Sequence, residues 1–314
     1  MKPNNIIAKI TKNIKKVKWE CSENECSDIS INSHLIQQNG ILKNISNDNH
    51  FFELGMTDAN LWQKKNIKPF EFKKKGIKYA LSYPLFCNKH DTEIFKPIES
   101  KNTDFKSYET FLLFSYRTLC SEIRKKQITV KTYERMLGAS GLIGFIKKDE
   151  FEASMNGNKL GIENLIEIKK DLINEISTPE ENYEYYTYSF PKIDIYASAI
   201  FSGNDIHKQK DDSDLDIFIH VLPMETELII SMGYNKSYYT KEMKAFCDSW
   251  EGLNSNQLKV KLSTLFYKNI ENWGLSAELY NSLKKENIKI YLDKVIKESS
   301  SYGVSTVDDF NLFE

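Results

Sequence analysis

The chain has 314 residues, which exceeds one typical domain, so we expect two or three packed units with a sizeable core. Its formal net charge of −1 gives no global reason to expect nucleic-acid binding, although local patches can still bind. The N-terminal residues lack the apolar stretch and cleavage site of a signal peptide, and no apolar run approaches the length of a bilayer. These features predict a cytoplasmic protein of bacterial type that makes no membrane contact.

Apolar spacing predicts helices in the first 180 residues. Residues 5–17 place isoleucines at helical intervals with lysines on the other face, which predicts an amphipathic helix. Apolar residues from Leu35 to Ile45 suggest a second helix, interrupted at Gly40, and residues 50–54 predict a short strand. Helical periodicity then extends from 104 to 176, with a break at the glycines of 138–144.

The pattern changes after Pro179, where β-branched and aromatic runs are bounded by Pro, Gly and Asp. These runs predict antiparallel strands, and helical spacing returns in the tail; the strands cover 183–190, 193–201, 215–222 and 226–234, and the helices 238–249, 256–271 and 276–297. We therefore predict an α+β fold with three parts: a zinc-stabilised module at 1–100, a helical connector at 101–180, and strands plus helices at 181–314.

Cysteine and histidine gather near the N-terminus. Three of the five cysteines and two of the five histidines lie at Cys21, Cys26, His34, Cys87 and His90. The sequences CSENEC and CNKH each form a short turn with two ligand types, and zinc prefers four tetrahedral Cys/His ligands. In a reducing cytosol, clustered cysteines favour metal binding over disulfides. We predict a structural Zn²⁺ on Cys21, Cys26, Cys87 and His90; the alternative is unrelated thiols, with Cys87 buried as a small hydrophobe.

Three further residues are candidates for catalysis. His34 can be a ligand, a general base or a structural hydrogen-bonding group. Asp91, followed by Glu99, would lie in the first turn of a helix beginning near residue 90, where a carboxylate interacts well with the helix dipole. The functional alternative is that His34, Asp91 or Glu99 activates water or binds a second, catalytic metal such as Mg²⁺ or Mn²⁺.

A lysine-rich segment from Lys64 to Lys78 is interleaved with aromatic residues, including Trp62, Phe70, Phe72 and Tyr79. Lysines can hold a phosphate backbone while aromatic rings stack on bases, so this segment is a candidate nucleic-acid surface. A solvated loop in a lysine-rich protein is the equal alternative.

The order of a cysteine pair, Ser33-His34, an apolar segment and a Cys/His turn resembles the treble-clef or HNH-like zinc modules of bacterial proteins, some from anti-phage defence loci. The resemblance covers roughly the first hundred residues. It implies a ββα-metal fold in which Cys21, Cys26, Cys87 and His90 hold structural zinc and His34 activates water in a nuclease. It also implies that a second protein encoded nearby could be a partner.

A second resemblance lies in the C-terminal half. Ser202-Gly203-Asn204 precedes Ser213-Asp214-Leu215-Asp216 by about ten residues, a pattern similar to polymerase-β-like nucleotidyltransferases. Carboxylates at i and i+2 on one strand point to the same face and can hold the metal of a triphosphate. The alternative is an acidic turn that opens a strand. Three classes therefore remain: a metal-dependent nuclease, a non-catalytic zinc-stabilised binding or sensor module, and a nucleotidyltransferase.

Overall fold

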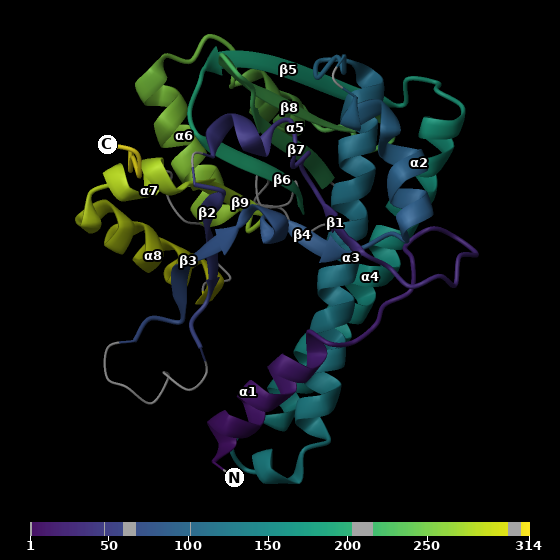
Figure 1. Cartoon of the computed structure of the whole chain (residues 1–314), viewed down its shortest axis with the longest axis vertical. Helices are drawn as coiled ribbons and strands as arrows, with labels where there is room; N and C mark the ends of the chain where they lie inside the picture. Colours follow the sequence, from purple (N-terminus) through teal and green to yellow (C-terminus); the bar gives the residue numbers. More distant parts are fainter. Residues whose placement is uncertain (1, 47, 59–66, 101, 203–215, 301–308) are drawn as a thin grey trace.

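Figure 1 shows the protein as a computed structural model, which describes residues 2–46, 48–58, 67–100, 102–202, 216–300 and 309–314. The fold mixes helices with antiparallel sheets, which confirms the predicted α+β class. Within these residues, no helix is both long and apolar enough to span a membrane.

A seven-stranded antiparallel sheet forms the centre of the molecule, in the order β3-β2-β9-β6-β7-β8-β5. Its strands are β2 (His50–Met56), β3 (Phe70–Gly76), β5 (Tyr183–Pro191), β6 (Ile195–Ser202), β7 (Asp216–Pro223), β8 (Glu227–Asn235) and β9 (Trp273–Ser276). The four C-terminal strands that the sequence predicts are all present and antiparallel. The four-residue strand β9 was not predicted, and it joins β2 to β6.

Side-chain alternation along β7 explains the layers around this sheet. Ile217, Ile219 and Val221 belong to a core shared with the C-terminal helices, whereas Phe218 and Leu222 belong to a core shared with the long middle helices. The first core is covered by α5 (Lys241–Asp248), α6 (Ser255–Lys268), α7 (Ala277–Ser282) and α8 (Lys285–Ser300). Both faces of the sheet are therefore buried, which accounts for the nearly continuous apolar sequences of β7 and β8.

The predicted helical middle consists of two long helices, α3 (Tyr108–Leu137) and α4 (Lys148–Ser177), which pack side by side (Figure 1). Ser107 caps α3, because its hydroxyl accepts a hydrogen bond from the Thr110 N–H at 3.2 Å. The predicted break lies at the 3₁₀ turn Ser140–Leu142 between the two helices. The predicted first helix is α1 (Pro3–Ile14), which packs against α3.

The predicted helix between Leu35 and Ile45 is wrong. The chain forms turns there, with a single 3₁₀ turn at Leu42–Ile45. The apolar residues of this segment are at most 1% exposed: Leu35, Ile36, Ile41 and Leu42. Because the turns are buried on all sides, their sequence is as apolar as that of a buried helix.

The N-terminal hundred residues contribute to two sheets. Strands β1 (Asn32–His34) and β4 (Ser82–Pro84) pair with each other, and α2 (Asn88–Glu99) follows them. Strands β2 and β3, by contrast, belong to the large sheet through β9. The ends of α2 and α4 lie close to the predicted boundaries at 100 and 180, but this sheet connects the first segment with the third.

A buried polar network lies between α3 and the sheet. The His220 ring, which is fully buried, contacts Ser115 Oγ through Nε2 at 3.1 Å and Ser198 Oγ through Nδ1 at 2.9 Å. Ser198 in turn bonds to Thr118 at 2.5 Å. Burial lowers the pKa of His220 to about 3, so the ring is neutral in the folded protein at pH 7.

We therefore predict an acid-sensitive contribution from His220. The unfolded chain binds a proton below about pH 6.5, whereas the folded protein does not, so stability falls as the pH drops. Between pH 7 and pH 5 the loss should be about 2 kcal/mol, measured by urea denaturation. His220→Gln should remove that part of the decline, while His50→Gln on the surface should keep it. Equal pH dependence in His220→Gln and the wild type would contradict this prediction.

Candidate metal centre

The first ligand pair lies on a closed loop between α1 and β1. The Cys21 N–H donates to the Asp28 carbonyl at 2.8 Å, and residues Glu20 and Ile29 form an isolated antiparallel bridge. Glu25 adopts a left-handed conformation, with φ of 59°, which turns the chain just before Cys26. The loop therefore brings Cys21 and Cys26 to one side despite the four residues between them.

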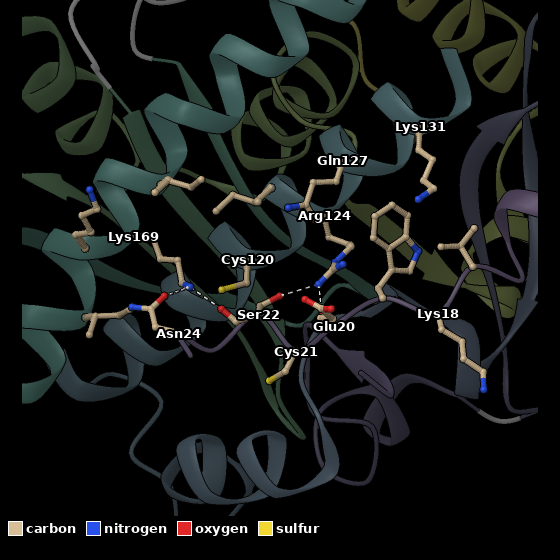
Figure 2. A pocket seen from close by; sticks show the side chains of 16 residues that line it. Lys18, Glu20, Cys21, Ser22, Asn24, Cys120, Arg124, Gln127, Lys131 and Lys169 are labelled. Carbon is tan, nitrogen blue, oxygen red and sulfur yellow. Dashed lines mark hydrogen bonds between the residues drawn. The ribbon is translucent and has the colours of Figure 1, made fainter. Parts of the chain in front are cut away.

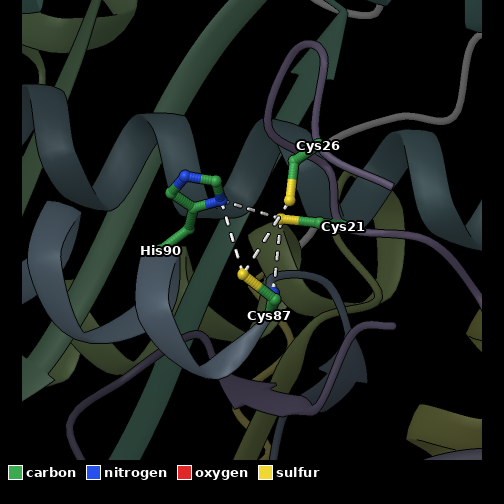
Figure 3. Close-up of side chains that lie close together, drawn as sticks. All are labelled: Cys21, Cys26, Cys87 and His90. Atoms are coloured by element: carbon green, nitrogen blue, oxygen red, sulfur yellow. Dashed lines mark hydrogen bonds between the residues drawn. The ribbon is translucent and has the colours of Figure 1, made fainter. Parts of the chain in front are cut away.

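The second pair lies at the start of α2. Cys87 is the N-cap residue, and His90 is three positions later in the first turn. Residues at i and i+3 of a helix start lie on the same face, so both side chains point toward the loop. Figure 3 shows the imidazole and the three thiols facing one another.

The distances among these four residues fit one tetrahedral metal ion. All four ligand atoms lie within 4.8 Å of one another. His90 Nδ1 is 3.4 Å from both Cys21 Sγ and Cys87 Sγ, and Cys26 Sγ is 4.0 Å from Cys87 Sγ. Zinc with Zn–S bonds of about 2.3 Å in tetrahedral geometry requires sulfurs about 3.8 Å apart. Cys21, Cys26, Cys87 and His90 can therefore hold a metal ion such as zinc.

Backbone donors support a thiolate at Cys21. The Cys87 N–H and the Glu23 N–H point at Cys21 Sγ at 3.3 and 3.4 Å. Burial nevertheless raises the pKa of Cys21 to about 11 in the protein without a metal. A bound cation reverses this balance, because metal coordination deprotonates a thiol. His90 would bind through Nδ1 and carry its proton on Nε2.

The other two cysteines do not join this site. Cys120 and Cys247 are fully buried, and burial raises the pKa of each to about 12. All five cysteines are free thiols, so no disulfide competes with metal binding. Cys120 and Cys247 behave as small core hydrophobes.

The predicted catalytic residues His34, Asp91 and Glu99 lie near the buried Arg117 and not in the cysteine cluster. Glu99 Oε1 accepts a hydrogen bond from Arg117 at 2.8 Å, and Asp91 forms an ion pair with the same guanidinium at 3.7 Å. Arg117 also stacks over the Phe95 ring at 3.9 Å. Two carboxylates and one arginine thus form an ion-pair network between α2 and α3.

His34 is half-buried on β1, where its Nε2 lies 3.1 Å from the Ile77 carbonyl. A carbonyl only accepts hydrogen bonds, so Nε2 carries the proton and Nδ1 is the basic nitrogen. Burial lowers the pKa of His34 below its ordinary value, and Arg117 acts in the same direction. His34 is therefore not a ligand of the cysteine cluster, although it is neutral at pH 7 and chemically able to accept a proton.

A second metal site is not evident around these three residues. In the described part of the chain, the Cys₃His cluster is the only group of three or more His, Cys, Asp or Glu side chains that converge as metal ligands. The Arg117 guanidinium lies beside Asp91 and Glu99, where a divalent cation would meet like-charge repulsion.

The lysine-rich segment is partly folded into the large sheet. Phe70 and Phe72 on β3 pack against the C-terminal core, and Lys73, Lys74 and Lys75 pair with carboxylates. Lys64, Lys65 and Trp62 lie outside the described residues. The nucleic-acid surface predicted from Lys64 to Lys78 stays a prediction.

The nucleotidyltransferase-like motif spans the end of β6 and the start of β7. Ser202, the last residue of β6, pairs with Asp216, the first residue of β7. Residues 203–215, which include Gly203, Ser213 and Asp214, lie outside the described part of the chain.

Sequence reasoning missed two buried arginines of α3, one beside α2 and one beside the loop of residues 19–30. Only three arginines occur in this lysine-rich chain, and Arg117 and Arg124 are both buried in α3. Their spacing of seven residues puts them on one face of that helix. The rarity of arginine in the sequence was the one feature that could have drawn attention to them.

Comparisons with known proteins give no family for this chain: no family model matches it, and neither curated proteins nor solved structures are significantly similar to it.

Proposed function

We propose that this protein binds one structural zinc ion through Cys21, Cys26, Cys87 and His90. The observation that carries the proposal is the convergence of three sulfurs and one imidazole nitrogen within 4.8 Å of one another. The ion would connect the loop of residues 19–30 to the start of α2, in addition to the hydrogen bonds from the Ser22 N–H to the Leu85 carbonyl and from the Cys87 N–H to Cys21 Sγ.

The donor set favours zinc and a structural role. Thiolate and imidazole ligands suit Zn²⁺, whereas Mg²⁺ and Ca²⁺ prefer oxygen. Catalytic zinc sites keep one position open for water, whereas four protein ligands complete the tetrahedron. The zinc itself would therefore stabilise the fold, and any chemistry would reside elsewhere.

Elemental analysis tests this assignment. We expect about one zinc per chain in the wild type and a large loss in Cys87→Ser. Cys120→Ser and Cys247→Ser replace buried thiols outside the cluster, so both should keep the metal. If the Cys21→Ser variant and the Cys87→Ser variant both keep full zinc occupancy, the ligands lie elsewhere.

A second candidate function is nucleotidyl transfer at the end of the β6–β7 hairpin. The pairing of Ser202 with Asp216 favours it, because one described residue from each half of the motif then lies at the same end of two neighbouring strands. Asp214 and Asp216 would bind the divalent metal of a nucleoside triphosphate. An acceptor hydroxyl would attack the α-phosphorus, lose its proton and release pyrophosphate.

An assay of pyrophosphate release tests this activity. It contains ATP or another nucleoside triphosphate, Mg²⁺ and a compound with an acceptor hydroxyl. Asp216→Asn should abolish the release, while Asp248→Asn on the exposed face of α5 should leave it unchanged. Release that survives in Asp216→Asn would exclude the hairpin as the site.

The nuclease and anti-phage hypotheses are supported only by the HNH-like resemblance. The ion pairs of Asp91 and Glu99 with Arg117 disfavour a catalytic Mg²⁺ or Mn²⁺ at that face. Metal-dependent cleavage of nucleic acid that His34→Ala abolishes, with zinc retained, would support a nuclease. A non-catalytic binding or sensor module is the alternative if the wild type cleaves nothing.

A further inference from the structure

A cavity of about 460 Å³ lies beside the cysteine loop, between α3, α4 and residues 17–24 (Figure 2). Its size falls within the range of small-molecule sites. It is lined by five cationic side chains and a single acidic one, Glu20; the cations are Lys18, Arg124, Lys131, Lys169 and Lys170. The cavity therefore has a strong excess of positive charge.

Two of these cations are buried and have no carboxylate partner among the described residues. Arg124 is 5% exposed and Lys169 is 8% exposed. Arg124 donates to the Glu20 carbonyl at 2.6 Å and to Ser22 Oγ at 3.3 Å, and Lys169 donates to the Ser22 carbonyl and to Asn24 Oδ1 at 2.5 and 3.0 Å (Figure 2). Neither forms an ion pair with a carboxylate among the residues that the structure describes. Burying an uncompensated charge is costly, so an anion in the cavity would relieve that cost.

Arg124 also has a free donor at this position. Its Nε is buried and has no hydrogen-bond partner in the described structure. Guanidinium groups bind phosphate with two parallel hydrogen bonds, and lysine adds a point charge. Arg124 and Lys169 can therefore neutralise one phosphate group from two sides of the cavity.

The remaining wall suits a planar apolar group. Ile123, Ile166 and Ile173 line it, and so does Trp19 from the segment of residues 17–24. The guanidinium of Arg124 and the ammonium of Lys131 lie 5.0 and 5.6 Å from the Trp19 ring centre. These cation–π contacts hold both cations beside the isoleucine wall, so a base on that wall would have phosphate-binding charges next to it.

We infer that this cavity binds a nucleotide, with its phosphates directed to Arg124, Lys131 and Lys169 and its base against the isoleucines beside Trp19. This site is separate from the proposed nucleotidyltransferase edge, because Ser202 and Asp216 are not among its lining residues. It is also distinct from the proposed zinc role, although Cys21 borders both. The competing explanation is that the cations only offset the net negative charge of three thiolates on one zinc ion.

Calorimetric titration of the zinc-loaded protein with ADP tests the inference. We expect one ADP site that Lys131→Gln weakens about tenfold, since a charged hydrogen bond contributes on the order of one factor of ten in affinity. Lys131 lines the cavity and forms no ion pair within the described residues, so this change should spare the fold. Lys159→Gln, on the exposed face of α4 and outside the cavity, is the matched control and should bind ADP as the wild type does.

Three results would overturn the assignment. No binding of ADP by the zinc-loaded wild type would leave the cations as counter-charges of the thiolates. Equal ADP affinity in Lys131→Gln and the wild type would place the nucleotide elsewhere, including at the β6–β7 hairpin. Adenosine or pyrophosphate binding as tightly as ADP would contradict joint recognition of base and phosphate. Zinc content measured in each variant separates these outcomes from failure of the metal site.

Discussion

Chelation of zinc should destabilise the protein by more than about 4 kcal/mol, the linkage expected when a ligand exceeds its dissociation constant a thousandfold. The four ligands come from two segments about sixty residues apart, so they converge only in the folded chain and metal binding free energy becomes folding free energy. Thermal unfolding with and without a chelator measures the effect. Hydrogen exchange should rise first in residues 19–30 and 85–99, while β7 and β8 stay protected by their two cores.

Cys87→Ser supplies the control for chelation. This variant should already show the lowered unfolding temperature, and chelator should lower it no further. An unfolding temperature of the wild type that chelator does not change would mean that the cysteine loop is held without a metal, by Arg124, Lys169 and the Tyr116–Glu23 hydrogen bond at 2.9 Å.

Glu53→Ala should cost about 2–6 kcal/mol, because it removes the acceptor of two buried donors and each unsatisfied buried donor costs about 1–3 kcal/mol. Glu53 is 3% exposed on β2, and it accepts hydrogen bonds from the Leu81 N–H at 2.8 Å and the Tyr196 hydroxyl at 2.9 Å. Its other oxygen pairs with Lys75 at 2.5 Å. The substitution leaves two buried donors without an acceptor, which adds to the lost contacts. Gly274 on β9 makes room for this cluster, since a Cβ there would clash with the Tyr196 hydroxyl.

Urea denaturation of Glu53→Ala beside Glu71→Ala measures this effect. Glu71 is on the neighbouring strand β3 and forms a 3.5 Å surface ion pair with Lys73, so its loss should change stability by at most about 0.5 kcal/mol. A loss below about 1 kcal/mol in Glu53→Ala would contradict the role of Glu53 as the connection between β2, β6 and the backbone at Leu81.

Local pattern was enough to predict most elements and the four residues that converge as a possible metal site. Runs of β-branched and aromatic residues predict strands β5 to β8, and helical spacing of apolar residues predicts α3 and α4. Cys21, Cys26, Cys87 and His90 could be named because two short turns each place a pair of ligand types together, whatever the fold between them.

Features that depend on distant packing were not predictable in the same way. Leu35 to Ile45 contains a helix-like number of apolar residues, but turns surrounded by core on every side bury them equally well. Strand β9 is too short for a pattern, and its pairing depends on β2 and β6. Arg117 binds Asp91 and Glu99, and Arg124 approaches Trp19, across separations of up to about a hundred residues that no local window contains.

X-ray absorption at the zinc edge of the purified wild-type protein is the most direct test of the metal centre. We expect three sulfur neighbours at about 2.3 Å and one nitrogen neighbour at about 2.0–2.1 Å, the shell of a closed Cys₃His site. Replacing Cys87 with serine should remove a sulfur from that shell or remove the metal. A spectrum with only oxygen and nitrogen neighbours, or a protein that carries no zinc after purification in its presence, would contradict the assignment of Cys21, Cys26, Cys87 and His90.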